Sequence, residues 1–180
     1  MTEARQYTVF ETAIGPCALA FTPRGIDSVG LPDRSKAAHP ARFNQIADRA
    51  AMPLPREIGA IVDTIVAHLR GDLQDLARIR VDLERVSPFD RRVYARARAI
   101  PAGETLEYGA LAAELGGVGL SRAVGQALGR NPVPLIVPCH RVVRAGGSLG
   151  GFSATGGTAL KLRLLTIERA RGPQFGFDFG

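Results

Sequence analysis

Short apolar runs separated by turn residues occupy the first 31 positions of the chain. The runs cover residues 7–12, 17–21 and 26–31, and glycine and proline lie between them. Strands of this length, joined by such turns, are typical of an antiparallel meander. The pattern therefore predicts a small antiparallel sheet at the beginning of the chain.

A helical period replaces this pattern after a polar connection at 32–55, for which we predict at most a short helix at 41–51. Between Ile58 and Leu69, apolar residues recur every three or four positions and form one stripe, which predicts a single amphipathic helix. His68 lies beside this stripe. We interpret it as a surface or boundary residue rather than as a ligand.

Another helix begins after a charged connection at 72–86, which we expect to form a strand or an extended linker. Ser87 can cap this helix, Pro88 suits its first position, and Asp90 lies three residues after the cap. The composition of the chain changes at the same point. We therefore predict a domain boundary at Val86/Ser87, which divides the chain into domains at 1–86 and 87–180.

Two short helices follow, at about 108–115 and 122–128, with a glycine-containing turn between them and Ser121 as a cap. This is the helix-turn-helix pattern. The second of the two helices carries small residues such as Gly125 and Ala127. Small residues let a helix approach another surface closely, but they also suit tight packing between helices, and the pattern leaves both open.

Apolar residues recur once more in a last helix, at about 158–169, whose buried face we expect to include Leu160, Leu162 and Leu164. The elements together predict the α+β class. A small antiparallel sheet with a helix comes first, and a mostly α domain with a helix-turn-helix follows it.

The composition excludes several classes of protein. The chain has 180 residues, 46% of them hydrophobic, which is enough to bury a core without disulfides. We find no apolar stretch of about 20 residues and therefore expect no membrane span. The first residues lack the layout of a secretory signal. Two cysteines, Cys17 and Cys139, cannot build a disulfide framework, which favours a reducing cytoplasm.

Positive charge is concentrated in the second predicted domain. The net charge is +6, yet residues 1–86 carry 11 basic and 11 acidic side chains, whereas residues 87–180 carry 12 basic and 6 acidic ones. Nearly all the basic residues are arginines, which favour bidentate contacts with phosphate. The charge indicates a polyanionic partner such as nucleic acid, with a general bias toward arginine as the alternative.

The segment 131–143, NPVPLIVPCHRVV, carries the candidate chemistry. Cys139 follows a short apolar stretch, and a thiol beside His140 and Arg141 is expected to have a lowered pKa. Adjacent side chains of an extended chain point to opposite sides, so His140 needs a turn or a bridging water to act on Cys139. A lone cysteine is also common as a small core residue, and these residues alone leave both interpretations open.

An ordered set of motifs resembles one protein family. Tyr108 precedes GALAAELG, and the chain continues with Arg122-Ala123-Val124-Gly125, Asn131-Pro132, Pro138-Cys139-His140-Arg141-Val142-Val143, Gly150-Gly151-Phe152-Ser153, Leu164-Leu165 and Glu168. Residues 87–168 thereby resemble the methylated-DNA–protein-cysteine methyltransferases (O6-alkylguanine-DNA alkyltransferases), with a looser likeness before them. The resemblance implies a ribonuclease-H-like supporting domain and a winged-helix-like domain that binds DNA and accepts the alkyl group.

The resemblance also implies DNA repair by direct reversal, with one turnover per molecule. Cys139 would accept a methyl or other alkyl group from O6 of a guanine that has been flipped out of the duplex. His140 and Glu168 would form the relay that deprotonates the thiol, Tyr108 would help guanine to leave, and Asn131 would hold the turn before Cys139. The implied DNA-binding residues are Arg122, which would fill the gap in the stack, and Ala123, Gly125, Gln126, Arg130 and Arg141. The implied pocket walls are Leu128, Val142, Phe152 and Ser153.

The partner implied is double-stranded DNA containing O6-alkylguanine, bound by a monomer in the cytoplasm without a cofactor. Some relatives bind zinc in the first domain. Cys17, His39 and His68 do not fall on that ligand pattern, so we expect no metal.

A few positions depart from the family pattern. Phe152 stands where tyrosine is usual, Ala154 and Thr155 are extra, and Glu107 brings a carboxylate near the expected DNA phosphates unless it points away. Two other functions compete with repair. One is a non-enzymatic, alkyltransferase-like protein that only binds lesions, against which Cys139 argues. The other is a thiol hydrolase or redox protein, which would act on small substrates with multiple turnover.

Overall fold

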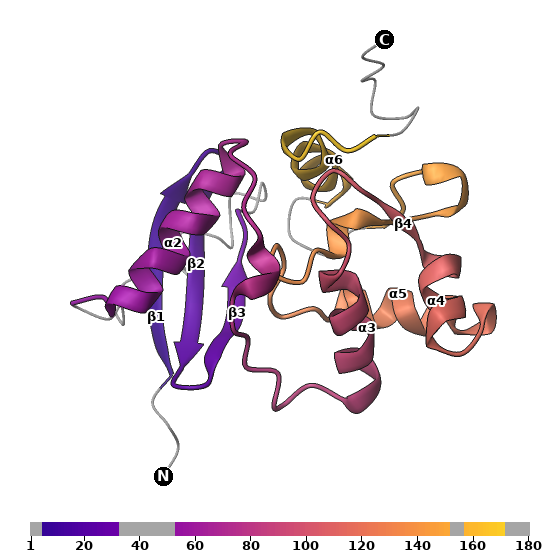
Figure 1. The fold of residues 1–180 in the computed structure, drawn as a ribbon, viewed down its shortest axis with the longest axis horizontal. Helices are drawn as coiled ribbons and strands as arrows, with labels where there is room; N and C mark the ends of the chain where they lie inside the picture. The colour runs from indigo at the N-terminus through magenta and orange to yellow at the C-terminus, as the bar shows by residue number, and fades with distance from the viewer. Residues whose placement is uncertain (1–4, 33–52, 152–156, 172–180) are drawn as a thin grey trace.

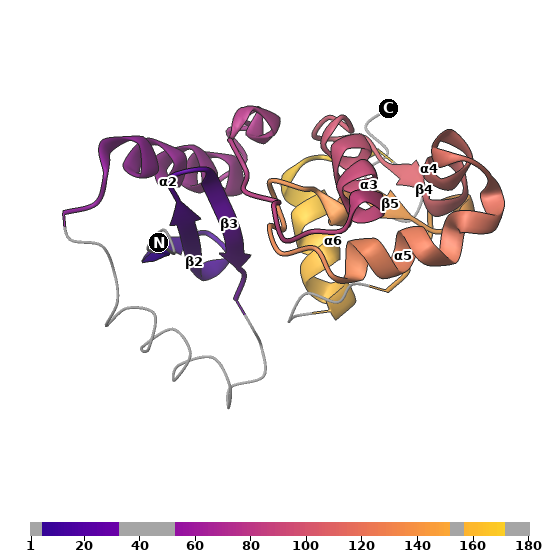
Figure 2. The ribbon, with the colours of Figure 1, turned by 90° about the horizontal axis from the view of Figure 1, so that it is seen from below.

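Two groups of elements lie next to each other, an N-terminal sheet with its helix and a C-terminal group of helices (Figures 1 and 2). The structure is a computed structural model and describes residues 5–32, 53–151 and 157–171. Because the sheet comes first and the helices follow it, the predicted α+β class is confirmed.

Within the described residues, the N-terminal sheet consists of three strands, β1 (Gln6–Thr12), β2 (Gly15–Thr22) and β3 (Gly25–Gly30). They pair antiparallel in chain order, so the predicted meander is confirmed. Cys17 and Leu19 of the central strand β2 are fully buried. Cys17 is therefore a core residue of the sheet.

Helix α2 (Arg56–Leu69) packs against this sheet with the predicted apolar stripe, and Ile58 and Ile65 are buried (Figure 1). The chain turns away at Gly71, whose φ of +93° favours glycine. His68, in the last turn of α2, is only 1% exposed. The interpretation of His68 as a surface or boundary residue is wrong, because its ring is enclosed between Gln74 and Glu168 from the other half of the chain.

The connection at 72–86 contains one short turn, η1 (Leu76–Arg78), and then runs extended beside β3. The Ile26 N–H donates to the Arg80 carbonyl at 2.9 Å, and the Asp82 N–H donates to the Ile26 carbonyl at 2.8 Å. Gly25, with a φ of +136°, permits this approach, because a Cβ there would lie 2.5 Å from the Arg80 carbonyl oxygen. The prediction of an extended connection is confirmed.

The C-terminal helices lie close to their predicted positions. Ser87 caps the first of them, since its Oγ accepts the Asp90 N–H at 3.1 Å. Two details differ from the prediction. Ser121 lies inside a helix and donates its hydroxyl to the Val118 carbonyl, so it is not a cap. Leu162 is 38% exposed and does not join the buried face. The elements are α3 (Pro88–Arg98), α4 (Tyr108–Leu115), η2 (Val118–Leu120), α5 (Ser121–Gly129) and α6 (Gly157–Ile167).

A short parallel pairing that the sequence did not predict joins two distant parts of this half. It links β4 (Leu106–Glu107) with β5 (Val142–Val143). β4 leads directly into Tyr108 at the start of α4, and β5 directly follows η3 (Cys139–Arg141). The pairing therefore holds the beginning of α4 beside the segment that carries Cys139.

A backbone hydrogen bond and a side-chain hydrogen bond tie the two groups of elements together. The Val29 N–H of β3 donates to the Pro132 carbonyl at 2.9 Å, and Arg163 of α6 donates to the Ala13 carbonyl at 2.5 Å. The N-terminal sheet thus supports both the segment before Cys139 and helix α6. Over the ranges given above, no helix has the length and apolar character needed to cross a membrane.

Candidate functional site

Cys139 lies where a buried, proline-rich segment ends in a tight turn. The turn is η3, which provides the change of direction that His140 needs to leave the line of Cys139. Asn131 braces the approach, because its Nδ2 donates to the Val137 carbonyl at 2.8 Å and its Oδ1 accepts the Val133 N–H at 3.0 Å. Asn131 thus joins both ends of the segment 133–137 that leads to Cys139.

A hollow of about 700 Å³ opens beside Cys139, although only 7% of the residue is exposed. This volume is in the range of pockets that enclose a small molecule or a single base. Tyr108 of α4 and Leu128 of α5 line it together with Cys139. The sulfur is thus enclosed by protein but reachable through the hollow.

Glu168, after the end of α6, gathers a buried hydrogen-bonded cluster around its carboxylate. Its Oε1 lies 3.0 Å from Nε2 of His140 and 2.8 Å from a terminal nitrogen of Arg141, while its Oε2 accepts Nε–H of Arg141 at 2.9 Å. Nδ1 of His140 is buried and has no hydrogen-bond partner among the described residues. Nε2 of His140 therefore faces the carboxylate of Glu168, whereas Nδ1 has no described partner and can accept a proton.

Burial dominates the protonation of the two central groups. It raises the pKa of the Cys139 thiol, while a hydrogen bond from Asn131 and the nearby ammonium of Lys161 oppose this effect. It also lowers the pKa of His140, against the attraction of Glu168. The expected lowering of the Cys139 pKa is wrong, because loss of hydration outweighs the neighbouring positive charge. Both shifts favour the neutral forms, a thiol and an imidazole.

Lys161 of α6 is a buried basic residue near Cys139 that the sequence did not indicate. It is completely buried, its Nζ donates to the Val142 carbonyl at 2.6 Å, and it lies 5.7 Å from the centre of the Tyr108 ring. Burial lowers its pKa to about 8, and attraction to the thiolate form of Cys139 opposes that shift. The sequence contained one indication of this burial, because Lys161 lies one turn before Leu165 and therefore on the apolar face of the helix.

Three of the expected DNA-binding residues border the hollow, namely Arg122, Gly125 and Gln126 of α5. Arg122 and Gln126 are exposed, and Gly125 lies between them with its Cα facing the Tyr108 ring. Ala123 is half-buried. Arg130 is exposed as well, but its guanidinium holds Asp90 at 3.0 and 3.2 Å. Ala127 is fully buried, and its carbonyl accepts the Tyr94 hydroxyl of α3, so this small residue serves packing between helices. Gly125 instead borders the hollow, where the absence of a side chain permits close approach.

Two of the expected site residues have other positions. Arg141 is buried, and its guanidinium donates to Glu168 and to the Ile100 carbonyl, which leaves no group to meet DNA. Val142 is fully buried and does not line the hollow, although its carbonyl receives Lys161. Both assignments are corrected on this ground. Phe152 and Ser153, together with the extra Ala154 and Thr155, lie outside the described residues, as does His39.

The loop after β5 accounts for the unusual carboxylate at Glu107. Its Oε1 accepts the Gly146 N–H at 2.9 Å, in the turn η4 (Ala145–Gly147). Arg144, just before this turn, is exposed and lines the hollow, and the sequence reasoning had not singled it out. Glu107 is therefore engaged by the backbone, and Arg144 adds a positive charge at the edge of the site.

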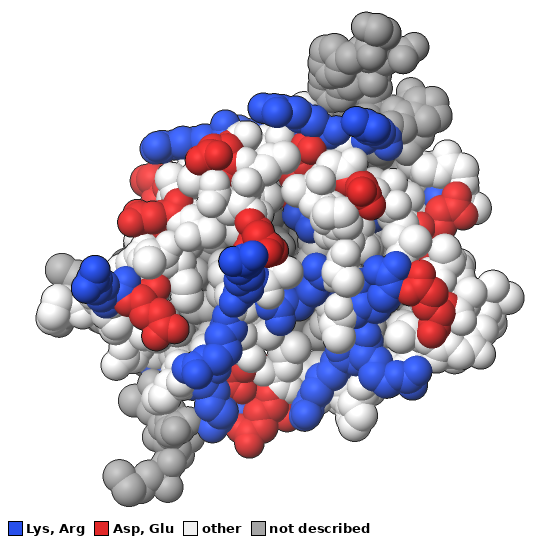
Figure 3. Space-filling model, viewed as in Figure 1, with Lys and Arg blue, Asp and Glu red and all other residues white. Residues whose placement is uncertain are grey.

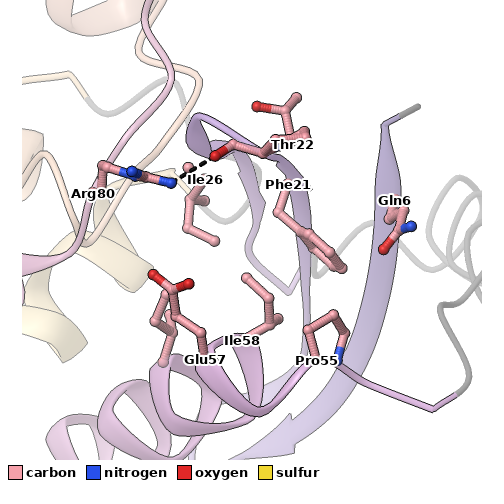
Figure 4. A pocket seen from close by; sticks show the side chains of 11 residues that line it. Gln6, Phe21, Thr22, Ile26, Pro55, Glu57, Ile58 and Arg80 are labelled. Carbon is pink, nitrogen blue, oxygen red and sulfur yellow. Dashed lines mark hydrogen bonds between the residues drawn. The ribbon is translucent and has the colours of Figure 1, made fainter. Parts of the chain in front are cut away.

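A second hollow, of about 240 Å³, lies in the N-terminal half (Figure 4). Phe21, Ile26 and Ile58 give it a largely apolar wall, and Arg80 donates to the Pro23 carbonyl at 2.6 Å beside it. No cysteine or histidine is among its described lining residues. Cys139, in contrast, lines the other hollow.

Basic side chains are spread over the surface rather than isolated from acidic ones. On the face seen in Figure 3, acidic residues lie close to many of the arginines. Ion pairs of this kind include Arg24 with Glu84 and Arg78 with Asp75. The position of Arg122 and Arg144 beside the hollow is therefore more informative than the net charge.

Comparisons with known proteins agree with this geometry. Residues 88–170 match the family described as 6-O-methylguanine DNA methyltransferase, DNA binding domain. A methylated-DNA–protein-cysteine methyltransferase of Mycobacterium tuberculosis is 36% identical over 93% of this chain and 94% of that protein. One of Mycolicibacterium paratuberculosis is 43% identical over 66% of this chain and 70% of that protein. The crystal structure of Mycobacterium tuberculosis OGT in complex with DNA superposes with a TM-score of 0.72 at 33% identity, covering 93% of this chain and 95% of that one.

Proposed function

Because the chain belongs to the methylated-DNA–protein-cysteine methyltransferase family, we propose that it repairs DNA by moving an alkyl group from O6 of guanine to Cys139. Each molecule acts once, since a thioether has no easy hydrolytic exit. The observation that carries this proposal is a buried thiol that opens to a base-sized hollow, next to a histidine with one unpartnered nitrogen.

The transfer step exchanges a proton for an alkyl group. The thiol proton of Cys139 moves toward Nδ1 of His140, directly or through a water molecule, as the sulfur attacks the alkyl carbon. A C–S bond forms, the C–O6 bond breaks, and its electron pair remains on guanine. The imidazolium of His140 then gives up this proton and the departing guanine takes up one proton, so the products are an S-alkylcysteine, a neutral His140 and an ordinary guanine.

The fixed charge of Glu168 supports this proton transfer. Burial acts to raise the pKa of Glu168, but the charge of a protonated His140 and the hydrogen bonds to the carboxylate outweigh it, so the pKa lies far below its usual range. Glu168 therefore does not take the proton but stabilises the imidazolium that forms on His140. Tyr108, in contrast, stays protonated because burial raises its pKa. Its hydroxyl can therefore donate a hydrogen bond to N3 of the departing guanine.

DNA is the partner of this site. We propose that α5 enters the minor groove, where its small residues allow close approach, and that Arg122 fills the gap left by the flipped base. The exposure of Arg122 at the edge of the hollow supports this role. We also propose a domain boundary at Val86/Ser87 and action as a monomer in the cytoplasm.

The stoichiometry of repair tests the proposal. Duplex DNA with one O6-methylguanine is added in increasing excess, and the O6-methylguanine that disappears is counted. We expect the loss to stop at one lesion per protein. Cys139→Ala should abolish the loss and retain DNA binding. Cys17→Ala is the matched control, because Cys17 is buried with a pKa raised to about 11 and lies in the sheet.

Two other results would each replace the proposal. Binding of the lesion by the wild-type protein without loss of O6-methylguanine would identify a lesion-binding protein. Loss that continues beyond one lesion per protein would identify a catalyst with turnover.

A further inference from the structure

A second histidine, from the other half of the chain, reaches the carboxylate of the relay. His68 lies at the end of α2, and its Nε2 is 2.9 Å from Oε1 of Glu168, a residue 100 positions away in sequence. Only 1% of His68 and 2% of Glu168 are exposed. The contact is thus enclosed by protein.

The other contacts of His68 determine its tautomer. Its Nδ1 accepts the backbone N–H of Gln74 at 3.1 Å, so this nitrogen carries no proton. Nε2 therefore carries the proton and donates it to Glu168. Gln74 of the 72–86 connection and Glu168 thus fix the two nitrogens of the ring.

Three donors consequently meet at one oxygen. Among the described residues, Oε1 of Glu168 receives Nε2–H of His68, Nε2–H of His140 and one N–H of Arg141. Nε2 of His140 donates to Glu168 in this arrangement, which leaves Nδ1 unprotonated and without a partner among the described residues. The orientation of the His140 ring therefore depends on how His68, His140 and Arg141 share Oε1 of Glu168.

We propose that His68 is a positioning residue for the alkyl transfer, through which the N-terminal half holds Glu168 and sets the basicity of His140. This inference rests on the proposed function. His68 touches neither substrate nor thiol and acts only through the carboxylate. The N-terminal half thereby contributes a side chain to the relay as well as support.

The physical argument concerns the charge of Glu168. An imidazolium at His140 is stabilised by that charge, and every donor on the same oxygen draws part of it away. The charged and titratable groups that face the carboxylate are Arg141 and His140 from η3 and His68 from α2. Arg141 holds both carboxylate oxygens, whereas His68 shares only Oε1 with His140 and is therefore the partner whose removal tests this sharing. Removing the His68 donor should make His140 bind a proton more readily.

The test compares two substitutions of His68 by single-turnover transfer rates between pH 5 and pH 9. His68→Gln keeps an N–H close to the position of Nε2, whereas His68→Phe removes it. We expect His68→Phe to slow transfer by roughly tenfold, as loss of an orienting partner typically does. Its acid limb should also move to higher pH. His68→Gln should restore most of the rate and the wild-type acid limb.

Ile65→Ala provides the control for a purely structural effect. Ile65 is fully buried one turn earlier in α2, so this variant weakens the same helix without touching Glu168. It should lower stability but leave the acid limb in place. An acid limb that is the same in His68→Phe and wild type, or that moves equally in Ile65→Ala, overturns the inference.

A measurement on the wild-type protein covers the case in which His68→Phe does not fold. The ¹⁵N shifts of the His68 ring should show a protonated Nε2 and an unprotonated Nδ1 at neutral pH. The opposite tautomer, or an imidazolium, overturns the inference. Wild-type transfer is measured in the same series, so failure of the proposed function appears separately as a wild-type protein that transfers nothing.

Discussion

The buried ion pair between Glu168 and Arg141 should dominate the local stability of the site. Their side chains are 2% and 7% exposed, and two hydrogen bonds join them at 2.8 and 2.9 Å. Glu168→Gln removes the negative charge with almost no change in shape. It leaves the guanidinium of Arg141 buried with no opposite charge and turns one of its acceptors into a donor.

Breaking one side of a buried pair of this kind reduces the free energy of unfolding by about 3–5 kcal/mol. For a chain of this size, that loss lowers the midpoint of thermal unfolding by roughly 6–20 °C. Thermal and urea unfolding followed by circular dichroism would measure both quantities. Glu114→Gln is the matched control, because Glu114 pairs with Arg96 on the surface and its loss should have a far smaller effect.

The double variant Glu168→Gln/Arg141→Met isolates the cause. It removes the unpaired positive charge as well, so it should be more stable than Glu168→Gln alone. A Glu168→Gln variant within about 1 kcal/mol of wild type would refute the reasoning. So would a double variant whose loss is the simple sum of the two single losses, since that shows no coupling between the groups.

Further predictions concern Lys161, Tyr94 and Arg122. Burial lowers the folded-state pKa of Lys161 to about 8, against 10.5 for the free side chain, so the unfolded chain binds the extra proton between these values. The free energy of unfolding of wild type, relative to Lys161→Met, should therefore rise by about 2–3 kcal/mol from pH 7 to pH 10; a constant difference across urea titrations contradicts this. Tyr94 donates to the Ala127 carbonyl at 2.8 Å between α3 and α5, and Tyr94→Phe should lower the free energy of unfolding by about 1–2 kcal/mol in urea; no loss would mean that the bond contributes nothing. Arg122→Ala should slow transfer from duplex DNA more than transfer from free O6-methylguanine; equal slowing would show that Arg122 does not assist flipping.

Local sequence patterns were sufficient for most of the fold. The strands, α2 and the helices α3 to α5 follow from apolar spacing, caps and glycines, which act over a few residues. The pairing of β4 with β5 did not follow from them, since each strand has two residues and its partner is 36 positions away. Pairings of this kind depend on the tertiary structure.

The same distinction applies to the site. Cys139, His140 and Glu168 could be named because the motifs place them in order. Arg141 and His68 were misassigned, since a charged or titratable side chain is usually exposed and only the position of Glu168 makes their burial favourable. The pKa of Cys139 was misjudged for a related reason. Neighbouring charges can be read from the sequence, whereas the loss of hydration comes from the surrounding fold.

The most direct test of the central claim is the location of the transferred group after reaction. Wild-type protein is incubated with duplex DNA containing O6-methylguanine and digested, and the masses of the peptides carrying Cys139 and Cys17 are compared. One added methyl group on the Cys139 peptide, with the Cys17 peptide unchanged, is the expected result. A repaired duplex with an unmodified Cys139 peptide would contradict the account.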